Sequence, residues 1–262
     1  MDFTARLAAA MTENPNRTNL CLVTAVDVEF KTAIGLLGQT ILSVESKFKI
    51  CRGFVADRRV TVLQTGMGAR GFAEWFSEHL KTNRYDALVV VGLAGGLDPK
   101  LKTGDAVVYE LCLDARSQSV EIRCDERLTE SLFEALQLAS LRSFRGTGIT
   151  VSRIVIDAAE KLLLGGEHQA LAVDMESFDV LRVAAEFGLP AAAVRVVSDE
   201  AESDLPNFNY AFNYAAEPDG KMNYQRMITA MLKRPTATLR FLRNLKSVID
   251  ALRKSLEVVL RP

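Results

Sequence analysis

The sequence predicts an α/β fold with three layers, in which helices cover both faces of a mixed central sheet. Short apolar runs rich in β-branched residues recur along the chain, and segments with helical periodicity lie between several of them. Such alternation is typical of a mostly parallel or mixed sheet packed between helices. Unusual acidic and glycine clusters follow Val26 and Val91 and surround Met175, where predicted strands end. Ligands of such sheets bind at those ends.

Seven segments are predicted to be buried strands. They are 20–26, 59–66, 87–93, 105–111, 145–151, 170–175 and 191–198. Four segments have helical patterns, and these are 71–81, 126–140, 158–164 and 178–187. The chain shows no internal repeat, so we expect a single domain over residues 1–262. Residues 202–223 are rich in Asn, Pro and Tyr and predict an irregular loop, which either closes over a site or runs across the surface.

A basic amphipathic helix is predicted at about 236–260. Its apolar stripe and neighbouring basic residues are Leu239, Leu242, Leu245, Ile249, Leu252, Leu256 and Leu260, beside Arg240, Arg243, Lys246, Arg253 and Lys254. Residues 221–262 carry 10 basic and 2 acidic side chains, whereas residues 1–220 carry 22 basic and 31 acidic ones. Such a helix usually docks on the body of the protein or on a partner subunit, and it can also lie on an anionic membrane surface.

The composition, 48% hydrophobic and 25% charged, is that of a soluble globular protein. No segment approaches the roughly 18 apolar residues of a membrane span, so we expect a cytoplasmic protein, with the basic helix as its one candidate contact with the inner face of a membrane. The four cysteines form no CxxC pair and only two histidines are present, so we expect no metal site. Trp75 is the only tryptophan and no basic and aromatic platform appears, so nucleic acid is not an expected partner.

Two carboxylates, Asp174 and Glu176, lie at the junction of a predicted strand and a predicted helix, in LAVDMESFDVL (171–181). Like charges this close are costly unless a ligand uses them or a cation offsets them.

Three segments together resemble a known family. VGLAGGLDPKLKTGDAVV (91–108), AVDMES (172–177) and VRVVSDEA (194–201) are similar to the glycine-rich loop, the ribose-binding Met-Glu motif and the Ser-Asp motif of the nucleoside phosphorylase and nucleosidase superfamily. TAVDVEF (24–30) and QTGMGARGFAE (64–74) extend the resemblance in the same order. The later segments resemble, more specifically, the hopanoid-associated phosphorylases, which are implicated in removing adenine from adenosylhopane.

The resemblance implies a nucleoside phosphorylase-like fold and cleavage of the N-glycosidic bond of a purine nucleoside of the adenosine type, by phosphate or by water. It implies a homo-oligomer that needs no metal or organic cofactor, with phosphate as a co-substrate if the reaction is phosphorolysis. Cleavage leaves positive charge on the ribose and negative charge on the base, so a proton donor at the base and acceptors around the sugar both lower the barrier.

The roles of single residues follow from the same resemblance. Asp199 matches the general acid at the base, and Glu29 matches the glutamate that positions the attacking water. Glu176 matches the acceptor of the ribose hydroxyls, and Met175 packs on the sugar face. Arg195 fits a family arginine, whose pairing with Glu176 or Asp174 would offset the like charges of these two acids. The other substrate-binding candidates are Asp174, which has a supporting role, Ser198, Gly92, Ala94, Gly95 and Gly66. Arg70 is the candidate phosphate ligand.

Two departures from the family pattern leave the reaction open. Leu93 stands where many relatives have Ser, and the arginine that phosphorolytic relatives carry just upstream is missing, which together with Glu29 favours water. SRIVI (152–156) replaces the segment whose aromatic residue stacks on the purine, so stacking would come from Phe208, Tyr210 or Phe212. The alternative function is a nucleoside-binding protein on the same fold that has lost turnover. A lipid-linked nucleoside would give the basic helix a use at a membrane.

Overall fold

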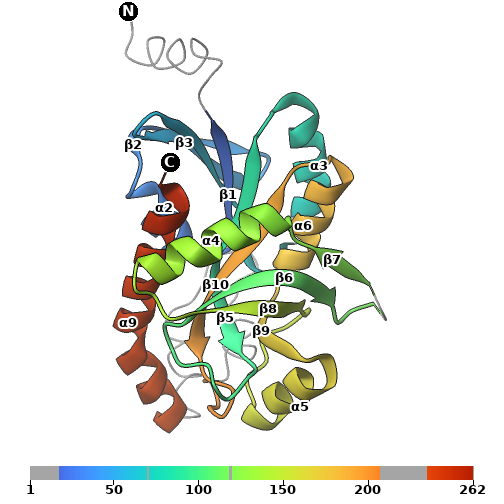
Figure 1. Cartoon of the computed structure of the whole chain (residues 1–262), viewed down its shortest axis with the longest axis vertical. Helices are drawn as coiled ribbons and strands as arrows, with labels where there is room; N and C mark the ends of the chain where they lie inside the picture. The colour runs from blue at the N-terminus through green and yellow to red at the C-terminus, as the bar shows by residue number, and fades with distance from the viewer. Residues whose placement is uncertain (1–17, 70, 118–119, 207–234, 262) are drawn as a thin grey trace, which may run out of the picture.

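The computed structural model describes residues 18–69, 71–117, 120–206 and 235–261 (Figure 1). Within these ranges a mixed sheet of ten strands runs through the molecule, and helices pack on both of its faces. The predicted fold class is therefore confirmed.

All seven predicted strands are present. They are β1 (Asn19–Thr24), β4 (Arg58–Gln64), β5 (Ala87–Gly96), β6 (Ala106–Asp114), β8 (Ser143–Thr150), β9 (Ala170–Asp174) and β10 (Ala191–Asp199). Three further strands were not predicted: β2 (Gly38–Glu45), β3 (Phe48–Val55) and β7 (Glu121–Arg123). β2 lies at the end of the sheet and exposes most of its side chains, so it lacks the apolar run by which buried strands are recognised.

The strand order is β10-β6-β8-β9-β5-β1-β4-β3-β2, and β10 pairs with β5 as well. This additional pairing closes β5, β10, β6, β8 and β9 into a ring at one end of the sheet. The sequence predicts a mixed sheet between helices and says nothing of this ring, because ring closure depends on pairing between distant segments and leaves no local pattern. β1, β5 and β10 run parallel, so their carboxyl ends meet at the same edge.

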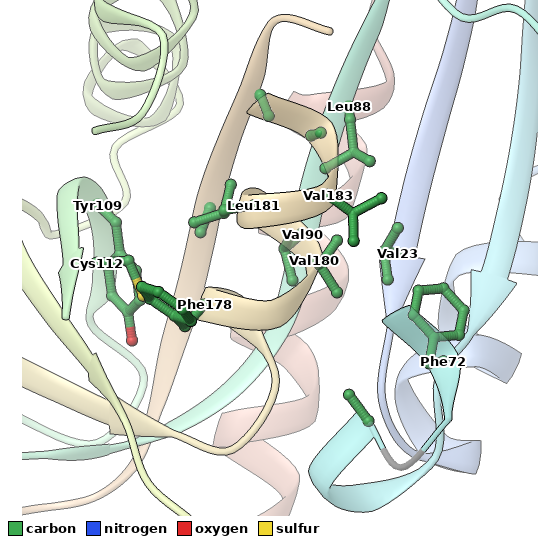
Figure 2. Close-up of a cluster of buried hydrophobic side chains, with 14 of the residues drawn as sticks. Val23, Phe72, Leu88, Val90, Tyr109, Cys112, Phe178, Val180, Leu181 and Val183 are labelled. Atoms are coloured by element: carbon green, nitrogen blue, oxygen red, sulfur yellow. The ribbon is translucent and has the colours of Figure 1, made fainter. Parts of the chain in front are cut away.

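The helices bury two apolar clusters on opposite faces of the sheet. α3 (Phe72–Thr82) and α6 (Ser177–Glu186) cover one face. There Phe72 lies beside Val23, and Val180 lies beside Val90, whereas Phe178 lies beside Tyr109 and Cys112 (Figure 2). α2 (Asp27–Ile34), α4 (Glu126–Leu138) and α9 (Pro235–Leu260) cover the other face. α5 (Ala158–His168) covers a smaller cluster beside β9. The sequence predicts α3, α4, α5 and α6 but not α2, which spans only eight residues directly after a strand.

The predicted C-terminal helix is present as α9, but its apolar stripe is not buried along its whole length. Leu252, Leu256 and Leu260 pack into the cluster with α2 and α4. In the first half of the helix, Leu239 and Leu242 are 71% and 53% exposed. The docking expected of this helix therefore holds for its second half. Among the described residues, no helix is both long and apolar enough to cross a bilayer.

Candidate active site at the strand ends

Glu29, Gly92 and Arg195 come together where β1, β5 and β10 end. Arg195 stands opposite Gly92 in the parallel register of β10 and β5. A Cβ atom at position 92 would lie 2.6 Å from both Nη1 of Arg195 and Oε1 of Glu29. Only glycine therefore leaves room for these two charged groups beside the strand.

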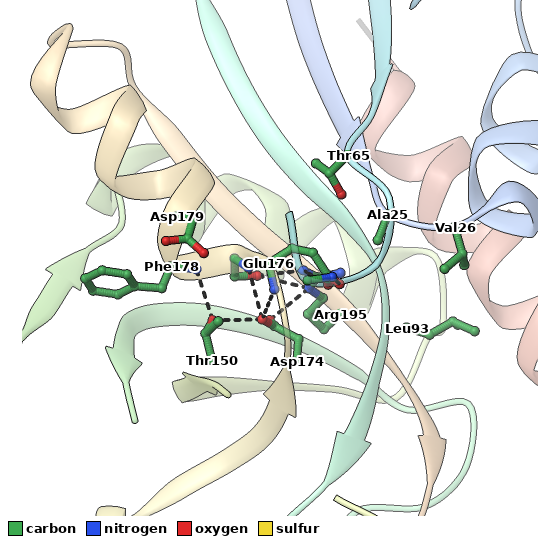
Figure 3. A network of polar contacts seen from close by, with 12 residues as sticks. Ala25, Val26, Thr65, Leu93, Thr150, Asp174, Glu176, Phe178, Asp179 and Arg195 are labelled. Atoms are coloured by element: carbon green, nitrogen blue, oxygen red, sulfur yellow. Dashed lines mark hydrogen bonds and ion pairs between the residues drawn. The ribbon is translucent and has the colours of Figure 1, made fainter. Parts of the chain in front are cut away.

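Arg195 is the buried cation of the site (Figure 3). Its Nε lies 3.1 Å from Oδ2 of Asp174, and its Nη2 lies 3.6 Å from Oε2 of Glu176. Nε and Nη2 also donate to the Ser177 hydroxyl. The ion pairing that the sequence predicts is thus present, and it offsets the repulsion between the two acids. Nη1 is buried without a hydrogen-bond partner among the described residues, next to the space at Gly92.

Asp174 holds Arg195 in place, and both of its carboxylate oxygens are occupied by partners within the protein. Its Oδ1 accepts from the Thr150 hydroxyl and from the backbone N–H groups of Glu176 and Ser177. Its Oδ2 accepts from the Tyr109 hydroxyl and lies against Arg195. Burial by itself would raise the pKa of Asp174, but Arg195 and these hydrogen bonds hold it below the usual value. Asp174 therefore stays ionised and fixes Arg195.

Glu176 is held between a backbone donor and the arginine. Its Oε1 accepts from the backbone N–H of Gly68 at 2.8 Å. Burial raises the pKa of Glu176 to about 7, and Asp174 adds to the shift, whereas Arg195 and the Gly68 N–H act in the opposite direction. At neutral pH this carboxyl can therefore take up or release a proton at little cost.

Replacing Glu176 by glutamine is expected to make stability less sensitive to pH. The folded protein keeps a proton on Glu176 up to pH about 7, whereas an unfolded glutamate loses it near pH ~4.3, so the folded state binds more protons in between. Wild-type stability then falls as pH rises through this window. Urea unfolding measures the free energy of unfolding of the variant and of wild type. The value for the variant minus the value for wild type should rise by about 1–3 kcal/mol from about pH 5 to about pH 8. A difference that stays constant over this range would contradict the assignment.

Glu29 is buried at the first turn of α2, where it also caps the helix. Its Oε2 accepts from the backbone N–H groups of Ala25 and Val26, and its Oε1 accepts from that of Leu93 at 2.7 Å. Burial raises the pKa of Glu29, although Arg195 and the three N–H donors oppose the shift. The carboxylate is thereby fixed with Oε1 turned toward Gly92 and Arg195.

Asp199 lies at the other end of the glycine-rich segment. β10 contains a bulge between Val197 and Asp199. The bulge leaves Ser198 without a partner on β5 and changes the direction of the last residue of the strand. The Ser198 hydroxyl lies 2.6 Å from Oδ1 of Asp199 and 3.1 Å from the Ala94 carbonyl oxygen. A Cβ at Gly95 would lie 3.4 Å from Oδ2 of Asp199. The fully buried ammonium of Lys161, from α5, contacts the same Oδ2.

A cavity of about 240 Å³ opens beside Asp199. Ser198 and Asp199 line one side, and Ala237, Arg240 and Arg243 of α9 line the other. The basic helix therefore forms a wall of the space that Asp199 faces.

The remaining predicted residues lie around these two groups. Met175 is half-buried, and its methyl carbon would lie 3.6 Å from a Cβ atom added at Gly68. Gly66 has a φ of +75° and nothing within 4 Å of its Cβ position, so it allows the chain to turn at the end of β4. Arg70, Phe208, Tyr210 and Phe212 lie outside the described residues. The segment 152–156 lies next to the residues that follow Asp199, because the Ile156 carbonyl oxygen accepts from the backbone N–H of Leu205.

The sequence analysis missed several residues of the site. Tyr109 and Thr150 hold Asp174, and Ser177 holds Arg195, but a single hydroxyl in or beside an apolar strand carries no signal. Lys161 left no signal either, because it follows Glu160 in AAEKLLLGG (158–166), as an exposed lysine of a helix would. The described residues contain no group of three or more His, Cys, Asp or Glu side chains arranged to hold a metal ion.

Comparison with known proteins identifies the family. A model of the Phosphorylase superfamily matches residues 19–233. The 5′-methylthioadenosine/S-adenosylhomocysteine nucleosidase of Bacillus licheniformis is 24% identical over 219 residues, which cover 76% of this chain and 93% of that protein.

Solved structures show the same fold. The 5′-methylthioadenosine/S-adenosylhomocysteine nucleosidase from Neisseria meningitidis, in complex with methylthio-immucillin-A, has a TM-score of 0.72 at 17% identity, covering 93% of this chain and 99% of the other. Futalosine hydrolase of Helicobacter pylori has a TM-score of 0.66 at 17% identity, and the match covers 89% of this chain and 97% of the hydrolase chain. Because the family model spans most of the sequence, and in agreement with the order of its motifs, this chain belongs to the Phosphorylase superfamily.

Proposed function

We propose that this protein cleaves the N-glycosidic bond of a purine nucleoside of the adenosine type. The observation that carries the proposal is the placement of two acidic groups along residues 92–96, the C-terminal half of β5. Glu29, Glu176 and Arg195 lie at the Gly92 end of this segment, and Asp199 lies at its Gly95 end. A nucleoside bound along the segment would have its ribose at the first group and its base at the second.

Each group suits the charge that develops in its part of the substrate. Glu176 accepts hydrogen bonds from ribose hydroxyls and stabilises the positive charge that appears on the ring. Met175 covers the apolar face of the sugar. Asp199 contacts the base, where negative charge appears as the bond breaks. The names of similar proteins support an adenosine-type substrate, since two of them are 5′-methylthioadenosine/S-adenosylhomocysteine nucleosidases.

Water is the nucleophile that the charges favour. Among the described residues, three carboxyl groups (Glu29, Asp174 and Glu176) surround the single guanidinium of Arg195. Ionised Asp174 already balances Arg195, and any charge on Glu29 or Glu176 adds to the negative side. These described residues therefore offer a phosphate dianion no net positive charge, whereas a neutral water molecule needs none. The unpartnered Nη1 of Arg195 can donate to the oxygen of such a water, and Oε1 of Glu29 can accept from it.

The proposal is tested by incubating the protein with adenosine, methylthioadenosine and inosine, with and without phosphate, and following the free base by chromatography. Release that does not depend on phosphate is the expected result. Release that requires phosphate would refute the assignment of water. Nucleoside binding without release would assign the chain to the nucleoside-binding proteins and refute catalysis.

The first half of α9 favours a nucleoside that carries an apolar group. Leu239 and Leu242 are exposed beside Arg240 and Arg243, and these two arginines line the cavity next to Asp199. An exposed face of this kind suits an anionic lipid surface, from which a lipid-linked nucleoside would reach the cavity.

Sedimentation with lipid vesicles tests this part of the proposal. Wild-type protein is expected to bind vesicles that contain phosphatidylglycerol. The double variant Leu239→Ser/Leu242→Ser is expected to bind at least about tenfold more weakly, because it loses the two exposed leucines that would enter the bilayer. Leu138→Ser is the matched control, since Leu138 is 88% exposed on α4 and does not line the cavity. Equal binding of all three proteins, or no binding by wild type, would contradict a membrane contact through α9.

A further inference from the structure

Lys161 of α5 is fully buried and has no role in the chemistry proposed above. Its ammonium nitrogen has three acceptors: Oδ2 of Asp199, the Glu200 carbonyl oxygen at 3.2 Å and the Ser203 carbonyl oxygen at 2.8 Å. A neutral amine has only two N–H groups, whereas an ammonium has three. The three acceptors therefore match the three N–H groups of an ammonium.

Asp199 has a donor at each oxygen. Lys161 donates to Oδ2, and the Ser198 hydroxyl lies 2.6 Å from Oδ1. An ammonium against Oδ2 suits an ionised carboxyl, which accepts at both of its oxygens. The pair thus shares one transferable proton, between Nζ of Lys161 and Oδ2 of Asp199.

We infer that Lys161 is the positioning residue of the catalytic acid and that it supplies, through Asp199, the proton received by the departing base. The inference rests on the proposed function. As the C–N bond breaks, its electron pair leaves with the base, a base nitrogen takes a proton from Asp199, and Asp199 takes one from Lys161. The water oxygen bonds to the sugar carbon, and its proton passes to Glu29. Glu29 then releases a proton to solvent and Lys161 takes one up, so nucleoside and water give free base and ribose.

The other charged groups near Asp199 have partners of their own or lie across the cavity. Glu200 pairs with Lys102 at 3.1 Å, and Asp204 accepts from the backbone N–H of Ala158. Arg240 donates to the Ser203 hydroxyl, and Arg243 faces the cavity from α9. Among the described residues, Lys161 is the cation in ion-pair contact with Asp199.

Initial rates of base release by Lys161→Met at two pH values test the inference. At about pH 8.5, kcat is expected to fall by about 100-fold, because no lysine proton reaches the base. At about pH 5.5, the fall is expected to be less than about tenfold, because protons from solvent can then replace the one that the lysine supplies. KM should change little at either pH. Lys246→Met is the control, because Lys246 is exposed on α9.

A fall in kcat by the same factor at both pH values would indicate a purely structural role and overturn the inference, as would an unchanged rate. Thermal unfolding gives a readout that does not depend on turnover. The double variant Lys161→Met/Asp199→Asn is expected to unfold at no lower temperature than Lys161→Met, because it leaves no unpaired buried carboxylate. If the double variant unfolded at a lower temperature than Lys161→Met, the ion pair between Lys161 and Asp199 would be refuted. Absence of base release by wild type would refute the proposed function, and unfolding would still decide whether the pair exists.

Discussion

Asp199→Asn is expected to lower the rate of base release by about 10²–10⁴-fold, the usual contribution of a positioned acid. The asparagine amide has nearly the shape of the carboxyl group and can still accept a hydrogen bond from Lys161. It cannot take a proton from that lysine and pass it on. The loss should therefore appear in kcat, with nucleoside binding largely kept.

Measurement of free base by chromatography, beside nucleoside binding by calorimetry, checks this result. Asp250→Asn is the matched control, because Asp250 lies exposed on α9 and the substitution changes the charge by the same amount. A variant that releases base at the wild-type rate would mean that the acid lies elsewhere. A variant that has lost binding and activity together would mean that Asp199 acts mainly by holding the substrate.

Arg195→Met is expected to destabilise the fold by about 3–5 kcal/mol, the usual cost of removing one partner from a buried ion pair. The substitution leaves Asp174 and Glu176 buried close together, and it also removes a cation near Glu29. The loss of unfolding free energy should be smaller at about pH 5 than at about pH 8. At the lower pH these carboxyl groups can take up protons instead of staying charged.

Urea unfolding at the two pH values measures both effects. Arg182→Met is the matched control, because Arg182 is an exposed arginine of α6 whose partner, Glu186, lies one helical turn away. Such a surface pair contributes about 0.3–0.5 kcal/mol. If Arg195→Met were as stable as Arg182→Met, Arg195 would not be the cation that makes the acidic cluster tolerable.

Local patterns were sufficient to predict most of the fold. β5 and β10 are continuous apolar runs, because both of their faces are buried, and α6 has the apolar periodicity of a helix packed on a sheet. β2 could not be found in this way, since its exposed side chains leave no pattern. The closure of the ring through β5 and β10 could not be found either, because it depends on hydrogen bonds between strands about a hundred residues apart, Gly92 with Arg195 for example.

The sequence by itself determined which residue types the site contains and which family the chain resembles. Asp174, Glu176, Arg195 and Asp199 belong to short motifs that can be read in order along the chain. Only the tertiary structure decided what each of them does. In the fold, Asp174 is buried among five donors, and Nη1 of Arg195 has no hydrogen-bond partner among the described residues. Lys161, which lies 38 residues before Asp199 in the sequence, contacts it from another helix. The physical reason is that the charge state of a buried group depends on the donors and charges that surround it, and the fold brings these from segments far apart in the sequence.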